Sequence, residues 1–125
     1  MKPFYINEHV RWITREKKRV LLVDFSMCIA AQVEEIARAL PEYVTTQPRG
    51  SVLLLADFRG ASFDDEAHRV MKESSVFDKP YVKKSAWVGT ENLPHEFEQS
   101  LKDFSRREYL SFKTHREALD WLVKG

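Results

Sequence analysis

Two short, almost continuously apolar segments, residues 20–25 and 52–58, constrain the fold of this chain more than any other feature. Runs of this kind are typical of strands that are covered on both faces, as in the parallel sheets of α/β proteins. A stretch with apolar residues at helical spacing follows each run. The sequence therefore predicts an α/β layered fold in which these two strands are adjacent and central.

The predicted helices have recognisable ends. Apolar residues recur at helical spacing over residues 29–40, and Pro41 should stop that helix. Ser62 precedes Asp65 by three residues, which predicts that the Ser62 hydroxyl caps the next helix by accepting a hydrogen bond from the Asp65 backbone N–H. A third helix is expected over residues 93–104, and a Thr114/Glu117 capping box should begin the last one.

The remaining strands complete an order of β-β-α-β-α-β-α-β-α. Residues 10–14 and the charged turn 15–19 predict an N-terminal β-hairpin, and residues 109–112 a short strand. Residues 82–88 are expected at a sheet edge because Lys83 and Lys84 interrupt them. We predict a single-domain α/β sandwich over residues 1–125, with a mainly parallel central sheet of about five strands and about four helices.

Composition excludes several classes of function. The 125 residues include 20 Lys and Arg against 19 Asp and Glu, and a net charge of +1 does not steer the chain toward nucleic acid or an anionic membrane. The lone Cys28 leaves no internal disulfide. The apolar runs are too short for membrane insertion, and the N-terminus does not resemble a signal peptide. We expect a cytoplasmic protein.

The densest polar cluster follows the second apolar run, where ligands gather in open parallel sheets. Its members are Asp57, Arg59, Ser62, Asp64, Asp65, Glu66 and His68. Asp57 could bind a metal or accept a phosphoryl group, and Arg59 could pair with an anion. Helix capping and the helix dipole are the more ordinary explanation of Ser62 and the three acids. The acids would also repel an anion from that helix end.

No arrangement typical of an enzyme is present. The four histidines lack partners at ligand spacing, no phosphate-binding or nucleophile motif occurs, and Cys28 is more typical of packing than of reactivity. We expect no catalysis, no cofactor and no metal site.

Two basic runs need a separate interpretation. One is Arg15, Lys17, Lys18 and Arg19 around Glu16, and the other is Lys79, Lys83 and Lys84 around Tyr81. Cations beside aromatic residues can bind single-stranded nucleic acid, but charged turns are also the ordinary composition of solvated loops. We expect no nucleic-acid partner. Tyr5 and Trp12 would suit either a homodimer interface or the core.

The hairpin, residues 52–71, residues 77–89 and residues 112–123 together resemble the bacterial STAS-like proteins, relatives of the anti-sigma-factor antagonists grouped with the CRAL-TRIO lipid-transfer fold. The resemblance implies a non-enzymatic module that binds a protein partner or a small ligand. We predict residues 57–68 and 89–92 as the contact surface, because loops at the C-terminal ends of the strands need not serve the core and the first of them concentrates polar residues. The antagonists carry a phosphorylated hydroxyl where this chain has Asp64-Asp65-Glu66-Ala67. A permanently negative surface is expected there.

Two alternatives remain open from the sequence. One is an apolar-ligand or lipid-binding domain of the CRAL-TRIO type, although a chain of this length needs its apolar residues for its own core. The other is a receiver that accepts phosphate on an aspartate, because Asp24 and Asp57 end the two apolar runs. Receivers normally carry paired acids after the first strand, whereas Asp24 is followed by Phe25.

Overall fold

The computed structural model describes residues 4–96, 98–99 and 108–124. Its strands are β1 (Val10–Arg15), β2 (Lys18–Asp24), β3 (Val52–Asp57), β4 (Val82–Val88) and β5 (Glu108–Phe112), in the order β1-β2-β3-β4-β5. β1 and β2 are antiparallel, and all other neighbours are parallel. The described residues form three α-helices, α1 (Ala30–Val44), α2 (Asp65–Asp78) and α4 (His115–Val123), and the 3₁₀ helices η1 (Ile6–Glu8) and η2 (Thr90–Asn92). This confirms the predicted α/β class, the mainly parallel sheet and the hairpin.

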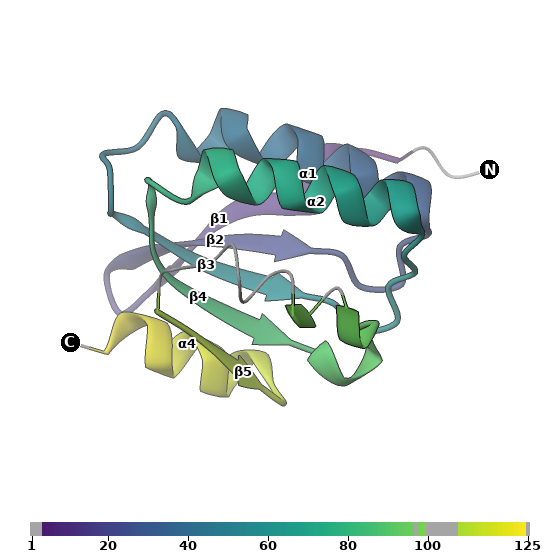
Figure 1. Ribbon diagram of the computed structural model, residues 1–125. Coiled ribbons are helices and arrows are strands. Elements are labelled where there is room, and N and C mark those ends of the chain that lie inside the picture. The colour runs from purple at the N-terminus through teal and green to yellow at the C-terminus, as the bar shows by residue number, and fades with distance from the viewer. Residues whose placement is uncertain (1–3, 97, 100–107, 125) are drawn as a thin grey trace.

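Helices cover both faces of the sheet, α1 and α2 on one side and α4 on the other (Figure 1). Leu21 and Leu54 face the first pair of helices, whereas Val20 and Leu53 face α4. Because alternate residues of a strand point to opposite faces, the covered parts of β2 and β3 need apolar residues at consecutive positions. The two predicted central strands are therefore confirmed as interior neighbours.

The turn of the β1–β2 hairpin contains only two residues. Arg15 pairs with Lys18, which leaves Glu16 and Lys17 as the two turn residues, with φ angles of 49° and 68°. Two positive φ angles are the signature of a type I′ turn, whose twist matches that of the strands.

Two sequence predictions about element positions were wrong. β4 lies inside the sheet, between β3 and β5, because Lys83 and Lys84 occupy only its beginning, whereas Ser85 and the residues after it are buried. α1 continues through Pro41 to Val44, whose side chain is completely buried. Burial of this last turn offsets the hydrogen bond that a proline removes from a helix.

The last helix agrees with its predicted capping. The Thr114 hydroxyl accepts a hydrogen bond from the Glu117 backbone N–H at 3.2 Å. The predicted third helix, residues 93–104, lies largely outside the described residues, so the expected number of four helices stays a prediction.

Candidate functional site

The loops that follow β2, β3 and β4 meet at one edge of the sheet, because parallel strands end on the same side (Figure 1). These loops comprise residues 25–29, 58–64 and 89–92. We call the surface that they form the strand-end face. Beneath it, the rings of Phe25 and Phe58 stack in parallel with their centroids 5.2 Å apart.

Backbone hydrogen bonds join the first two of these loops. The N–H of Phe25 donates to the carbonyl of Asp57, and the N–H of Met27 donates to the carbonyl of Arg59, each at 2.9 Å. The N–H of Ser62 donates to the carbonyl of Cys28, also at 2.9 Å. The strand pairing of β2 and β3 is thus continued into their loops, which limits the conformational freedom of the strand-end face.

The buried carboxylate of Asp57 organises the charged groups of this face. Arg59 donates from Nε to both carboxylate oxygens, at 3.0 and 3.1 Å, and from a terminal nitrogen at 2.6 Å. The backbone N–H of Arg59 adds a bond of 3.0 Å, and Nε2 of His115 lies 2.7 Å from Oδ2. One carboxylate therefore connects the end of β3 to its loop and to the first residue of α4.

The surroundings of Asp57 keep it ionised. Burial by itself would raise the pKa of this carboxyl, but the hydrogen bonds from Arg59 and His115 and the charge of Arg59 lower it below its ordinary value.

Gly89 permits the close approach of the third loop. It has a φ of 79°, and a Cβ there would lie 2.7 Å from the backbone nitrogen of Arg59.

Two apolar side chains project from the loop after β2 on the strand-end face. Met27 is 80% exposed and Ile29 is 60% exposed. Met27 has a φ of 59°, and it lies over Gly60, where a Cβ would be 2.3 Å from the methionine sulfur. Exposed apolar side chains grouped on one loop are candidates for contact with a protein partner.

A groove of about 390 Å³ adjoins Met27. It is lined by Phe4, Glu8, His9, Ser26, Met27, Cys28 and Gln32. The Cys28 sulfur lies 3.9 Å from Nδ1 of His9, but only 3% of the residue is exposed. Burial, with a smaller contribution from Asp24, raises the pKa of this thiol to about 11, so it is not activated as a nucleophile.

The structure places the seven predicted site residues in different environments. Arg59, Ser62, Asp64, Asp65 and Glu66 are exposed on or beside the strand-end face. Asp57 is only 1% exposed, so it cannot contact a partner directly, which corrects that assignment. His68 is half-buried, and its burial, followed by the charge of Lys72, lowers its pKa.

The predicted capping of α2 by Ser62 was wrong. Asp64 is the N-cap, and its carboxylate accepts a hydrogen bond from the Ala67 backbone N–H at 2.7 Å. Glu66 pairs with Arg69, and with Arg38 at 3.8 Å. Asp64 is still extended, so the helix begins at Asp65, two residues later than a cap at Ser62 would require.

Sequence reasoning missed three residues of this site. His115 reaches Asp57 from a distant part of the chain, and only the topology, which brings the start of α4 to the edge where β3 ends, could have indicated the pair. Ile29 was counted in the apolar stripe of the first helix, but it is the exposed N-cap of α1. Nothing in the sequence distinguishes the exposed Met27 from a core residue.

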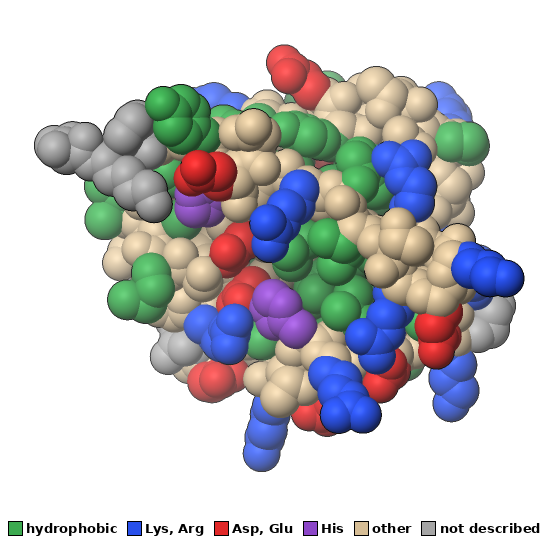
Figure 2. All heavy atoms as spheres, turned by 180° about the vertical axis from the view of Figure 1, so that it is seen from behind, with side chains coloured by type: hydrophobic (Ala, Val, Ile, Leu, Met, Phe, Trp, Pro, Cys, Tyr) green, Lys and Arg blue, Asp and Glu red, His purple; other side chains and the backbone are tan. Residues whose placement is uncertain are grey.

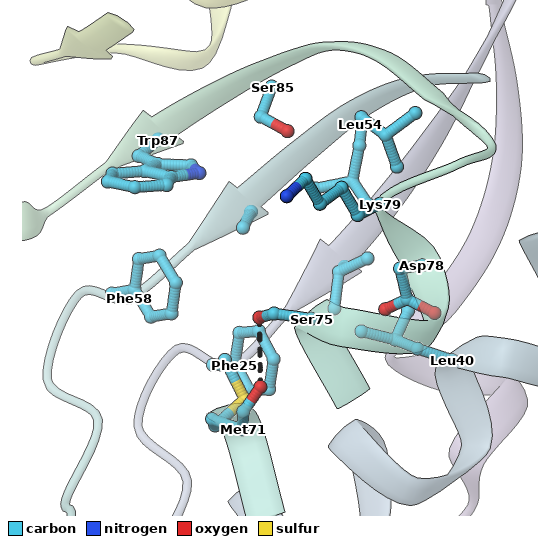
Figure 3. A pocket seen from close by; sticks show the side chains of 13 residues that line it. Phe25, Leu40, Leu54, Phe58, Met71, Ser75, Asp78, Lys79, Ser85 and Trp87 are labelled. Atoms are coloured by element: carbon cyan, nitrogen blue, oxygen red, sulfur yellow. Dashed lines mark hydrogen bonds between the residues drawn. The ribbon is translucent and has the colours of Figure 1, made fainter. Parts of the chain in front are cut away.

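A second cavity lies between the sheet and the helices α1 and α2, and its volume is only about 90 Å³ (Figure 3). Aromatic side chains line one end, and Asp78 lies at the other. The Ser74 hydroxyl donates to Oδ2 of Asp78 at 3.1 Å, whereas Oδ1 has no hydrogen-bond partner among the described residues. Burial raises the pKa of this carboxyl to about 7.

Among the described residues, no group of three or more His, Cys, Asp or Glu side chains is arranged to hold a metal ion. Within the same part of the chain, none of the helices has both the length and the apolar character that crossing a membrane requires. Tyr5 is exposed, while Trp12 is half-buried beneath the guanidinium of Arg19; the homodimer stays a prediction.

Comparison with known proteins identifies the fold. No protein-family model matches this sequence, and neither does any curated protein sequence. A crystal structure of an uncharacterized DUF3478-family protein from Shewanella loihica PV-4, described as having a SpoIIAA-like fold, matches with a TM-score of 0.69. The match covers 91% of this chain and 92% of the other at 17% identity. The chain thus has a SpoIIAA-like fold, in agreement with the STAS-like resemblance of its sequence.

Proposed function

We propose that this chain of SpoIIAA-like fold is a non-enzymatic interaction module that binds a protein partner through its strand-end face. The observation that carries the proposal is the pair of exposed apolar side chains, Met27 and Ile29, on a loop that backbone hydrogen bonds join to the loop after β3. An ordered surface loses little conformational entropy on binding, and a few well-packed anchor residues contribute most of the affinity at protein interfaces.

Charge on this face favours a partner with apolar and basic groups. Asp64 and Asp65 are exposed at the start of α2, beside the loop that carries Arg59. Their carboxylates are negatively charged without phosphorylation, because acids stand here in place of a hydroxyl that would have to be phosphorylated. Asp57 contributes indirectly, since it fixes the directions of Arg59 and His115.

The geometry gives less support to the two alternatives. The cavity of about 90 Å³ is far below the roughly 300–1,000 Å³ of typical small-molecule sites, so it does not suit a lipid. A receiver needs an accessible aspartate, but both oxygens of Asp57 accept hydrogen bonds and the residue is 1% exposed. Asp24 bonds the Ser26 backbone N–H in the same way as Asp57 bonds that of Arg59, which is ordinary turn chemistry.

The proposal is tested by capture from a lysate of the native host with three forms of the tagged protein. The first is the wild type, and the second carries Met27→Glu with Ile29→Glu. The third, a matched control, carries Val76→Glu with Phe77→Glu, because these residues of α2 are also exposed, at 52% and 66%.

We expect the wild type and the control to enrich the same protein, and the Met27/Ile29 variant to lose it. Unfolding temperatures should remain close to that of the wild type, since all four side chains are exposed. Equal enrichment by all three forms, or equal loss in both variants, would contradict the assignment of the strand-end face.

A further inference from the structure

We propose that a groove at the opposite edge of the sheet, where β2, β3 and β4 begin, binds a small anion with two or more phosphate groups. The groove has a volume of about 370 Å³. Its cationic lining residues are Lys18, Arg19, Lys83, Lys84 and Lys124. No Asp or Glu occurs among the lining residues that the structure describes. We call this site the basic groove; it is independent of the function proposed for the strand-end face.

Sheet topology explains why the two basic runs of the sequence meet in the basic groove. β3 lies between β2 and β4, and the three strands are parallel, so their first residues are neighbours. The register between β3 and β4 shifts at Val52/Leu53, and Lys83 is the residue left without a Cα partner on β3. α4 ends at the same edge, where Lys124 follows it.

Two of the lysines also stabilise α4. Lys18 Nζ donates to the carbonyl of Val123 at 2.8 Å, and Lys84 Nζ donates to the carbonyls of Trp121 and Lys124 at 3.4 and 3.1 Å. Cations at a helix C-terminus are favourable because the last carbonyls lack helical partners. The carbonyls are neutral acceptors, so these bonds position the ammonium groups without cancelling their charge.

Aromatic rings fix two of the cationic groups further. The guanidinium of Arg19 lies 4.2 Å from the ring centroid of Trp12, and Nζ of Lys84 lies 4.8 Å from that of Trp121. Cation–π contacts of this length restrain a long side chain. The basic groove is therefore partly organised before any ligand binds, which lowers the entropic cost of binding.

The size and the charge of the groove select the class of ligand. Its volume falls near the lower end of ordinary small-molecule sites. Five cations stabilise a phosphate ester, which carries up to two charges per group, more than they stabilise a single carboxylate.

A long polyanion fits less well, since nucleic acid needs an extended basic surface. The net charge is only +1, and acidic and basic side chains are interspersed over the back of the molecule (Figure 2).

The test is calorimetric titration of the intact protein with inorganic pyrophosphate, with acetate as a singly charged probe and a single-stranded oligonucleotide as a polyanion. The site variant carries Lys83→Ala with Lys124→Ala, which leaves the two lysines bonded to α4 unchanged. The matched control carries Lys72→Ala with Lys113→Ala and removes the same charge outside the residues that line the groove.

We expect saturable binding of pyrophosphate by the wild type and the control, and affinity weaker by about tenfold or more in the site variant. Amide NMR signals of residues 18–19, 51–53 and 83–84 should shift on titration. Absence of saturable pyrophosphate binding, or equal weakening in both variants, would overturn the proposal. So would tighter binding of acetate or of the oligonucleotide than of pyrophosphate.

Discussion

Two aspartates, one near each edge of the sheet, are buried to a similar extent but differ in charge. Asp57 is 1% exposed and Asp78 is 7% exposed. Asp57 meets a guanidinium, a backbone N–H and an imidazole, which lower its pKa against the effect of burial. Within the described part of the chain, the Asp78 carboxyl accepts a hydrogen bond from the Ser74 hydroxyl alone, and burial raises its pKa to about 7. Donors in contact with a carboxylate, rather than burial alone, decide its charge.

The two ends of the sheet also differ in the side chains that they expose. The strand-end face has exposed acids at the start of α2 and apolar side chains on its loops. The basic groove at the other edge is lined by five cations. A parallel sheet keeps its two edges apart, so one small chain can present two surfaces of opposite charge.

The largest expected effect on stability comes from removing the carboxylate of Asp57, which has more hydrogen-bond donors than that of Asp78. Asp57→Ala loses the bonds to Arg59 and His115, each a hydrogen bond to a charged group, and we expect the free energy of unfolding to fall by about 3 kcal/mol. Asp24→Ala is the control, because Asp24 ends the neighbouring strand but its side chain accepts one backbone bond, from Ser26; its cost should be about 1 kcal/mol. Urea denaturation of both variants measures the difference, and equal losses would refute the special role of Asp57.

Replacing the carboxyl of Asp78 should have the opposite effect and increase the free energy of unfolding. An unfolded aspartate has a pKa of about 3.9, so between about pH 4 and pH 7 only the unfolded state of Asp78 is ionised, and stability falls as pH rises. Asp78→Asn, which has the shape of the protonated acid, should therefore raise the free energy of unfolding at pH 8 by about 2 kcal/mol, after allowance for water entering around the ionised group.

The same variant should change little at pH 4, where Asp78 is protonated in the folded protein. Asp57 gives the reverse dependence: its folded pKa lies below the unfolded one, so its contribution is complete above about pH 4 and is lost as pH falls through the folded pKa. Denaturation series at pH 4 and pH 8 separate the two groups. A stabilisation by Asp78→Asn that is equal at both pH values would contradict the pKa assigned to Asp78.

The smallest effect concerns the start of α2, beside the strand-end face. Asp64→Ala removes the side-chain cap on Ala67 and should cost about 1 kcal/mol. Ser62→Ala should cost less than half of that, because the Ser62 bond to Cys28 uses its backbone N–H. Thermal unfolding of the two variants shows which residue caps α2. A larger fall in unfolding temperature for Ser62→Ala than for Asp64→Ala would support the sequence prediction instead.

The sequence predicted the order of the described elements because that order depends on local patterns. The apolar runs of β2 and β3 reflect burial on both faces, and the Thr114/Glu117 pattern correctly begins α4. The position of β4 failed because its first lysines were given the same weight as its buried second half. Neither burial nor strand order can be obtained from the polarity of two residues at one end of a strand.

The sequence found the strand-end loop but not its organisation. It grouped Asp57 with the exposed acids, since a carboxylate in a loop ordinarily faces water. Only the tertiary structure brings His115 to Asp57, and only the strand order brings Lys83 to the same groove as Lys18. Contacts between distant segments are set by the whole fold, so residue spacing cannot reveal them.

Amide hydrogen exchange of the complex with the captured partner tests the central claim most directly. If the strand-end face is the contact surface, exchange should slow on binding in residues 25–29 and 58–64 and stay unchanged in residues 15–19 and 83–84. Protection confined to the hairpin turn and the basic groove, with residues 25–29 and 58–64 unaffected, would contradict it.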